Sequence, residues 1–206
     1  MLEHFADSQR TLYDTSDDHE TLITRPRDLQ DNATPSGTAM AITALLKLAG
    51  FTDDVRYVDI AHQALAQMQT PTGGGMMSQY PLGFGQWLQA QAYALSKPRE
   101  IAIVGDPEAA DTQALLNVAR DGYRPFQVVA LGEPGIDDMQ LAQARQLPSN
   151  ASGAARSIAA VPLLEERDLV DGCATAYVCR DFTCQTPIAK PEELRAQLNQ
   201  TRLTPH

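Results

Sequence analysis

Apolar residues in the first half of the chain recur at helical spacing in three stretches. The stretch 38–49 is densely apolar, follows helix-start residues at 34–36 and precedes Gly50, which predicts a largely buried helix. A second helix is predicted to begin after the acidic residues at 53–54 and to run to about Met68, and a third stretch ends before Pro98, as helices often do. The side chains predicted to face the core are Met40, Ile42, Leu45, Leu46 and Leu48, then Tyr57, Ile60, Ala61, Ala64, Leu65 and Met68, then Phe84, Trp87, Leu88, Ala92 and Leu95.

The second half has a different pattern, in which short apolar runs flank helical stretches. The runs 100–105 and 126–131 enclose a helical stretch at 111–120, and this order predicts a β-α-β unit with parallel strands. Further elements are predicted as a helix at 137–146, a loop at 148–157, a strand at 174–178 and a helix at 191–200.

These patterns predict an α+β protein built from two parts. Residues 1–97 form α-helical hairpins, and residues 98–206 form a small parallel α/β unit, with the boundary near Lys97 and Pro98. A change from helices in series to alternating strands and helices is typical of such a boundary.

The composition of the chain argues against some classes of binding partner. The chain has 206 residues, 43% of them hydrophobic, and a formal net charge of −10, so it is long enough for a sizeable core and has no basic stripe for phosphate groups. We therefore expect no nucleic acid and no membrane as partner. The opening MLEHFADSQR lacks the apolar segment of a leader peptide, which favours a cytoplasmic location.

Three cysteines, Cys173, Cys179 and Cys184, lie close together in the sequence. An odd number of cysteines does not indicate a disulfide framework, so reduced thiols are the simplest expectation. The C-x4-C spacing of the last two leaves three interpretations open. Buried, unreactive cysteines are favoured over a metal site, which usually needs four ligands, and over a redox pair, which usually has C-x-x-C spacing.

The loop after the first predicted strand, 104–107, lies where nucleotide-binding folds place a phosphate loop. It has neither G-x-G-x-x-G nor the P-loop pattern, so a plain turn is the favoured interpretation. We predict no cofactor and no metal.

The densest polar constellation precedes the first long helix. It comprises Asp14, Asp17, Asp18, His19, Glu20, Arg25, Arg27 and Asp31. One interpretation is structural: the acids and arginines pair with one another and with helix ends, and so shape a long loop without chemistry.

Several short blocks, in one order along most of the chain, resemble the thioredoxin-domain-containing protein family related to spermatogenesis-associated protein. The blocks are DTSDDHE at 14–20, RPR at 25–27, DNATPSG at 31–37, YP at 80–81, PREI at 98–101, AYVC at 176–179 and CQTP at 184–187. The resemblance implies that the chain matches the C-terminal part of that family. Residues 1–97 would then be hairpins of an incomplete α/α toroid similar to six-hairpin glycosidases and sugar epimerases.

The resemblance also implies roles for the polar constellation, because loops at one rim of such a toroid surround a central cavity. Asp17, Asp18, His19 and Glu20 would be the catalytic acid or base candidates. Asp14, Arg25, Arg27 and Asp31 would bind the substrate, a small-molecule carbohydrate. The alternative is a non-catalytic module that docks to a thioredoxin-like domain, upstream or in trans, and helps to handle a redox client.

Overall fold

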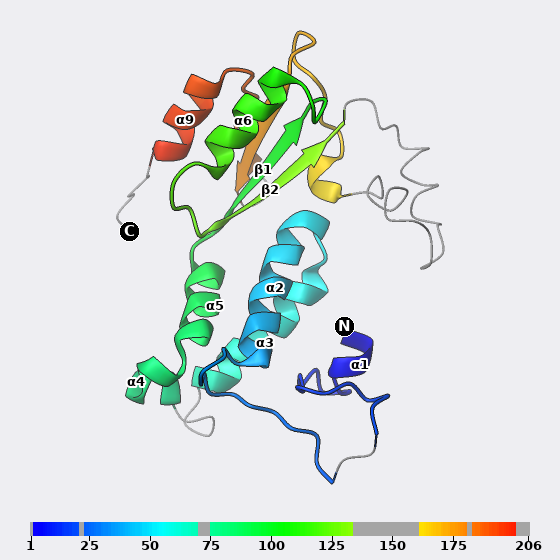
Figure 1. The fold of residues 1–206 in the computed structure, drawn as a ribbon, viewed down its shortest axis with the longest axis vertical. Coiled ribbons are helices and arrows are strands. Elements are labelled where there is room, and N and C mark those ends of the chain that lie inside the picture. Colours follow the sequence, from blue (N-terminus) through cyan, green and yellow to red (C-terminus); the bar gives the residue numbers. More distant parts are fainter. Residues whose placement is uncertain (1, 21–22, 70–74, 134–160, 181–182, 201–206) are drawn as a thin grey trace. The chain divides into compact units, whose positions relative to one another are not determined.

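The structure is a computed structural model that describes residues 2–20, 23–69, 75–133, 161–180 and 183–200. Its contacts divide the chain into two compact units. The first comprises residues 1–49 and 54–97, and the second comprises residues 50–53 and 98–206. Figure 1 shows the helices of the first unit and the sheet of the second.

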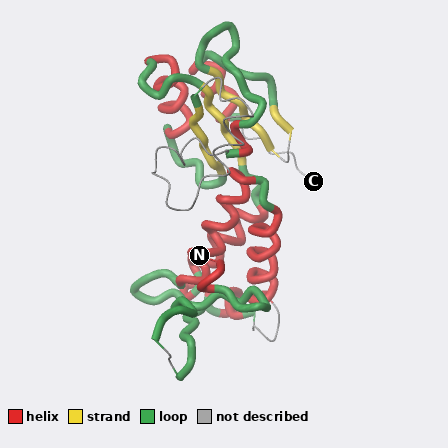
Figure 2. Tube along the Cα trace, turned by 90° about the vertical axis from the view of Figure 1, so that its right-hand side faces the viewer, coloured by secondary structure: helices red, strands yellow, loops and turns green. Residues whose placement is uncertain are grey.

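The first unit is helical, and a long polar loop, drawn in green in Figure 2, lies between its first short helix and the long helices. Its elements are α1 (Leu2–Phe5), α2 (Gly37–Thr52), α3 (Val55–Gln69), α4 (Met76–Gln79), the 3-10 helix η1 (Pro81–Gly83) and α5 (Gly85–Leu95). The three long helices predicted from hydrophobic spacing are therefore present as α2, α3 and α5.

The ends of α2 follow from local chemistry. The hydroxyl of Ser36 accepts a hydrogen bond from the Ala39 amide at 3.3 Å, which is the usual helix-start contact. The predicted stop at Gly50 is wrong, since α2 continues to Thr52. Asp53 takes the left-handed conformation instead, with φ of 51°, and aspartate tolerates this conformation better than most residues.

The core of the helical unit contains most of the side chains that periodicity assigned to it. Trp87 is fully buried, and its indole nitrogen donates to the Leu29 carbonyl at 2.8 Å. Along α3 the predicted inner face is confirmed by the buried Ile60, Ala61, Ala64, Leu65 and Met68.

Two helices have apolar residues on their exposed side as well. Along α5, Trp87, Ala90 and Tyr93 are buried, whereas Leu88, Ala92 and Leu95 are exposed. The prediction that these last three face the core is therefore wrong. Met40 and Leu48 of α2, also predicted to face the core, are 53% and 43% exposed.

The second unit is built on a four-stranded sheet with strand order β2-β1-β3-β4. Its elements are β1 (Arg99–Val104), α6 (Ala110–Arg120), β2 (Gln127–Gly132), the 3-10 helix η2 (Pro162–Leu164), β3 (Thr175–Arg180), β4 (Thr183–Cys184) and α9 (Pro191–Asn199). The β-α-β prediction is confirmed, because β1 and β2 pair in parallel.

The prediction of a wholly parallel sheet is wrong. Strand β3 pairs antiparallel with β1, and β4 pairs antiparallel with β3. The periodicity of a buried strand gives its existence but not its direction, which depends on how the chain returns to the sheet.

The sheet separates two small cores. On one face, Ile101 and Val178 pack with Leu115 of α6 and Leu194 of α9, and Figure 1 shows these two helices on the same side of the strands. On the other face, Ala102 and Val128 pack with Leu163 of η2.

Some sequence predictions fall outside the described residues, namely the helix at 137–146 and the loop at 148–157. None of the helices in the described part of the chain combines the length and the apolar character needed to cross a bilayer.

Candidate functional site

Asp31 joins the polar loop to the starts of two helices. One oxygen of its carboxylate accepts from the Ser36 amide and the other from the Gln86 amide, both at 2.8 Å. Gln86 lies in the first turn of α5, where amide groups have no partner within the helix. The Asp31 amide in turn donates to the Gly83 carbonyl at 2.8 Å. The carboxylate predicted to bind substrate therefore caps helices.

Asp14 and Arg25 also bind the chain itself. The Asp14 carboxylate accepts from the Asp28 amide at 2.6 Å. The Arg25 guanidinium donates to the carbonyls of His4 and Thr15 at 3.0 and 2.6 Å, and it lies 4.4 Å from the centre of the Tyr13 ring. These contacts hold two distant stretches of the loop together.

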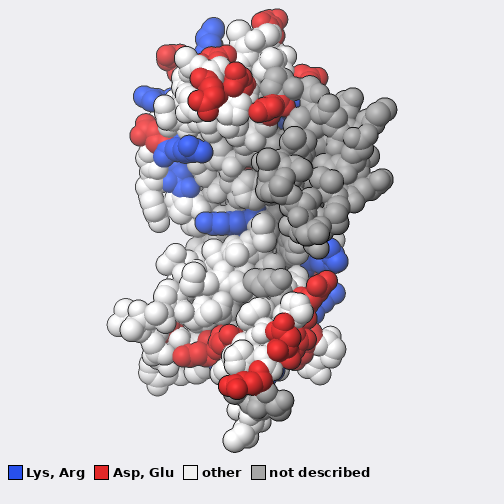
Figure 3. Space-filling model, turned by 45° about the vertical axis from the view of Figure 1, so that its right-hand side comes forward, with Lys and Arg blue, Asp and Glu red and all other residues white. Residues whose placement is uncertain are grey.

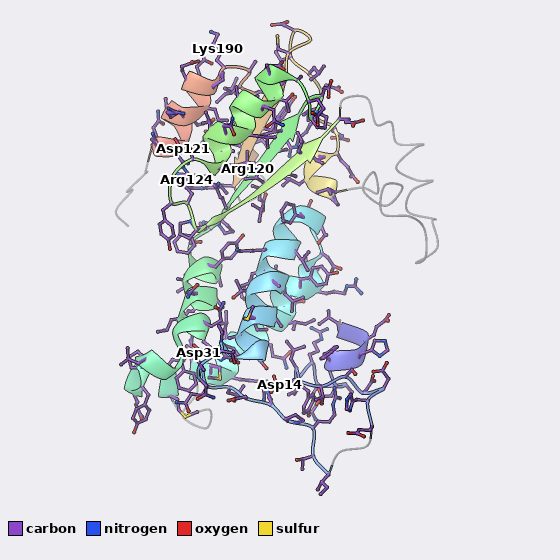
Figure 4. All side chains as sticks on the ribbon, in the orientation of Figure 1. Asp14, Asp31, Arg120, Asp121, Arg124 and Lys190 are labelled. Carbon is purple, nitrogen blue, oxygen red and sulfur yellow. A yellow bond between two sulfur atoms is a disulfide. The ribbon has the colours of Figure 1, made fainter. Side chains whose placement is uncertain are left out.

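Two of the predicted substrate-binding carboxylates lie near the start of α2, because a Cβ atom at Gly37 would be 3.0 Å from an Asp14 oxygen and Asp31 binds the Ser36 amide. In Figure 4, Asp31 lies beside the start of α5 and Asp14 lies toward α1. Arg27 is half-buried, and its Nε atom is buried without a hydrogen-bond partner among the residues that the structure describes.

Two of the four predicted catalytic residues lie together, beside a histidine that sequence reasoning did not select. The Nδ1 atom of His4 is 3.0 Å from a carboxylate oxygen of Asp17. One side-chain ligand atom from each of His4, Asp17 and Asp18 lies within 4.8 Å of the others. His19 and Glu20 are exposed.

Electrostatics within this cluster follow from its hydrogen bonds. The hydrogen bond to Asp17, followed by the charge of Asp18, raises the pKa of His4 above its ordinary value. The hydroxyl of Ser16 lowers the pKa of Asp18. At neutral pH the cluster therefore offers carboxylates beside a readily protonated imidazole, which is chemically able to exchange protons with a ligand.

The same three side chains are the described residues whose donor atoms best suit a metal ion. They would supply one imidazole nitrogen and two carboxylate oxygens, a set that several divalent ions accept. All three are exposed, and exposed acids gather on many proteins without any ion.

The second unit has a small pocket of about 50 Å³ at the ends of its strands. Arg99, Arg180, Gln185 and Gln197 are among the residues that line it. Burial, and then the positive charges of Arg180 and Arg124, lower the pKa of Arg99. The lining of this pocket therefore carries local positive charge in an otherwise acidic protein.

Cys179 and Cys184 form a disulfide bond, so the expectation of reduced thiols is wrong for this pair. Cys179 is 2% exposed, whereas Cys184 is exposed. The two residues are directly opposite each other in the β3–β4 register, which explains how C-x4-C spacing can close a bond. Cys173 is free and exposed.

Arg167 is the neighbour of this disulfide that sequence reasoning missed. Its Nη1 atom lies 3.3 Å from the Cys184 sulfur, and its Nε donates to the Leu163 carbonyl at 2.6 Å. The guanidinium lies 5.1 Å from the centre of the Tyr177 ring. The antiparallel pairing of β3 and β4 brings these groups together, and no strand at 183–184 was predicted from the sequence.

Comparisons with known proteins give one consistent relationship. No family model and no solved structure matches the sequence. Human spermatogenesis-associated protein 20 is 30% identical over 175 residues, which is 85% of this chain and 20% of the human protein. The rat and mouse proteins of the same name are 29% and 28% identical over 176 residues, again 85% of this chain and 20% of each relative. The chain therefore spans about a fifth of the length of these curated relatives, and it is a distant homologue of spermatogenesis-associated protein 20.

Proposed function

We propose that residues 1–97 are an assembly module, a set of α/α-toroid hairpins that functions by packing against further helical hairpins, in cis or in another chain. The observation that carries this proposal is the second apolar row on two helices. The row on α5 is Leu88, Ala92 and Leu95, and the row on α2 is Met40, Ala44 and Leu48, all exposed.

The spacing of these rows is what makes them informative. Positions i, i+4 and i+7 or i+8 lie on one side of a helix. Because α2 and α5 also bury apolar residues on their inner side, they are apolar on two sides, as in helices placed between two layers. On the face of the helical unit visible in Figure 3, uncharged surface lies beside clusters of Asp and Glu side chains.

The lengths of the relatives support a further stretch of polypeptide as the occupant. The chain matches only 20% of the human protein, so the homologous segment there functions with a much longer polypeptide. Helical hairpins are the kind of element that buries such rows in repeat arrays and toroids.

The test is a double variant, Met40→Gln with Leu95→Gln, compared with Leu45→Ala in the buried core. We expect the double variant to unfold within about 0.5 kcal/mol of the wild type, as surface changes do. Leu45→Ala should lose about 2–5 kcal/mol. The double variant should also bind less of a hydrophobic dye.

The binding probe is human spermatogenesis-associated protein 20 from which the aligned segment is deleted, with an isolated thioredoxin-like domain as a second probe. Calorimetry should show binding to the first probe with a negative heat-capacity change, lost in the double variant. Strong destabilisation by the double variant would assign the rows to the chain's own core and contradict the proposal. Binding to the second probe alone would favour docking to a redox domain.

A second candidate is carbohydrate handling, favoured by the cluster of His4, Asp17 and Asp18. Its closely spaced carboxylates and protonatable imidazole are the groups that glycosidases and epimerases use. The test is turnover or saturable binding of a panel of mono- and disaccharides. Activity or binding that disappears in Asp17→Asn and Asp18→Asn, but persists in Asp7→Asn, would support carbohydrate handling. Unchanged behaviour in both variants would exclude it.

A further inference from the structure

We propose that Cys179 and Cys184 are a dithiol–disulfide exchange site that passes two electrons from an external dithiol to an anionic disulfide. The activity belongs to the second unit and does not rest on the assembly role of residues 1–97.

The two sulfurs differ in access. Cys184 lies on the two-residue strand β4, both of whose residues are exposed, whereas Cys179 lies within β3 and is 2% exposed. A thiolate from outside can therefore reach the Cys184 sulfur and not the Cys179 sulfur. Such an exposed nucleophile with a buried resolving partner is the arrangement that exchange chemistry requires.

Arg167 favours Cys184 as the reactive sulfur. Its Nη1 atom is 3.3 Å from that sulfur, so a thiolate formed there would lie beside a positive charge. The guanidinium is held in place by its bond to the Leu163 carbonyl and by the Tyr177 ring. The Tyr177 hydroxyl is itself fixed, because it donates to the Asp168 carbonyl at 2.7 Å.

The charges around the pair select the class of substrate. Glu100 pairs with Cys179 in the antiparallel register and shares its face of the sheet, whereas Arg99 and Arg180, each one position along its strand, lie on the opposite face with Val178 and Ile101. Burial lowers the pKa of Arg167, and Tyr177, followed by Glu100 and Asp53, acts in the opposite direction. Arg167 is the positive charge in contact with the exposed Cys184 sulfur, in a chain whose net charge is −10, and it favours a negatively charged substrate.

The reaction balances as follows. In the reduced protein, the Cys184 thiolate attacks one sulfur of the substrate disulfide, whose S–S bond breaks and releases the first thiolate. Cys179 then loses its proton and attacks the Cys184 sulfur, which releases the second thiolate and restores the Cys179–Cys184 bond. An external dithiol re-reduces the pair by attack on Cys184 and becomes a disulfide, so two electrons pass through in each cycle.

The experiment uses the 206-residue chain in a Cys173→Ser background, so that only this pair reacts. Dithiothreitol is the electron donor, and mass spectrometry after alkylation counts the free thiols. We expect no free thiol before treatment of the oxidised folded protein and two after it. Resistance of the folded protein to about 10 mM dithiothreitol, as typical of structural disulfides, would overturn the proposal.

The substrate class is tested with two small disulfides, anionic 5,5′-dithiobis(2-nitrobenzoic acid) and cationic cystamine, mixed with the reduced protein. We expect the reduced protein to prefer the anionic probe over the cationic probe more strongly than free dithiothreitol does. The ratio of the anionic to the cationic rate should fall as the salt concentration rises. Arg167→Gln should slow the anionic probe by roughly three- to tenfold and move its pH–rate profile to higher pH, whereas Glu100→Gln should accelerate it. A ratio equal to that of free dithiothreitol in the wild type would contradict the proposal without the use of any variant.

Trapping identifies the attacking sulfur. With Cys179→Ser, the mixed disulfide should accumulate at Cys184 in one-to-one stoichiometry, whereas Cys184→Ser should not react while folded. Far-UV circular dichroism checks that both variants keep their fold. Equal trapping at either cysteine would exclude Cys184 as the entry point.

Discussion

The carboxylate of Asp31 accepts a hydrogen bond from the Gln86 amide across 55 positions of sequence, at 2.8 Å. Because its other oxygen binds the Ser36 amide, a single side chain fixes the loop to the starts of α2 and α5. A negative charge at the first turn of a helix is also favourable to the helix dipole.

Asp31→Ala should therefore destabilise the protein by about 2–3 kcal/mol, since two charge-assisted hydrogen bonds are lost and an amide in each helix start is left without a partner. Asp31→Asn keeps one acceptor and should lose less. Urea unfolding measures both, with Glu20→Ala on the same loop as a control expected within about 0.5 kcal/mol of the wild type. Full stability of Asp31→Ala, together with loss of ligand binding, would instead favour the substrate-binding role.

The hydrogen bond between His4 and Asp17 should make local stability depend on pH. Its bond to Asp17 raises the pKa of His4 in the folded protein. The interaction with protonated His4 therefore contributes fully below the ordinary pKa of about 6.5, and it is lost as pH rises through the folded-state pKa.

Nuclear magnetic resonance of the imidazole protons checks this directly. In the wild type the His4 titration midpoint should lie above that in Asp17→Asn, which removes the largest cause of the shift. Overlaying His4 titration curves in the two proteins would show that the contact with Asp17 is absent in solution.

Asp111 should contribute to stability in the opposite range of pH. Its carboxylate accepts from the Ala174 amide at 2.9 Å, and this bond, followed by that from the Thr112 amide, lowers its pKa. The contribution is therefore present above the ordinary pKa and is lost as pH falls through the folded-state value. Urea midpoints of wild type and Asp111→Asn should differ at pH 6 and converge toward pH 2. A constant difference would assign the loss to something other than the charge.

Hydrophobic periodicity predicted where the helices and strands of this protein lie better than it predicted which of their side chains are buried. Helices α2, α3 and α5 and strands β1, β2 and β3 follow from local spacing, because one turn or one alternation is enough to reveal them. The exposure of Leu88 and Leu95 could not be predicted, since a helix with two apolar sides gives no spacing signal for which side faces its own core.

The candidate sites show a similar limit. The polar loop was evident from composition. His4, however, is 13 positions away from Asp17, and no sequence rule predicts the hydrogen bond between them. The Cys179–Cys184 bond depends on an antiparallel register, which a strand's own residues do not encode. Features set by neighbouring residues were therefore predictable, whereas contacts that depend on how the chain folds back on itself were not.

Gly105 explains why the loop after β1 contains a glycine without a phosphate-binding pattern. Its amide donates to the Gly132 carbonyl at 2.9 Å, and a Cβ atom there would overlap the hydroxyl of Thr112 and lie 2.9 Å from the Cβ of Ala174. The glycine thus permits close approach of β1, α6 and the start of β3. Gly105→Ala should cost about 1–3 kcal/mol, the usual range for overpacking.

A double-mutant cycle separates this overlap from other effects of the substitution. Within the described part of the chain, the buried Thr112 hydroxyl oxygen has no hydrogen-bond partner, so Thr112→Ala alone should cost little. In the Gly105→Ala background it should recover part of the loss and give a coupling of at least about 0.5 kcal/mol. Gly85→Ala, where the new Cβ meets only an ordinary contact at 3.7 Å, is the control. Strict additivity of the two changes would locate the cost in the contact with Ala174 and not in the overlap with Thr112.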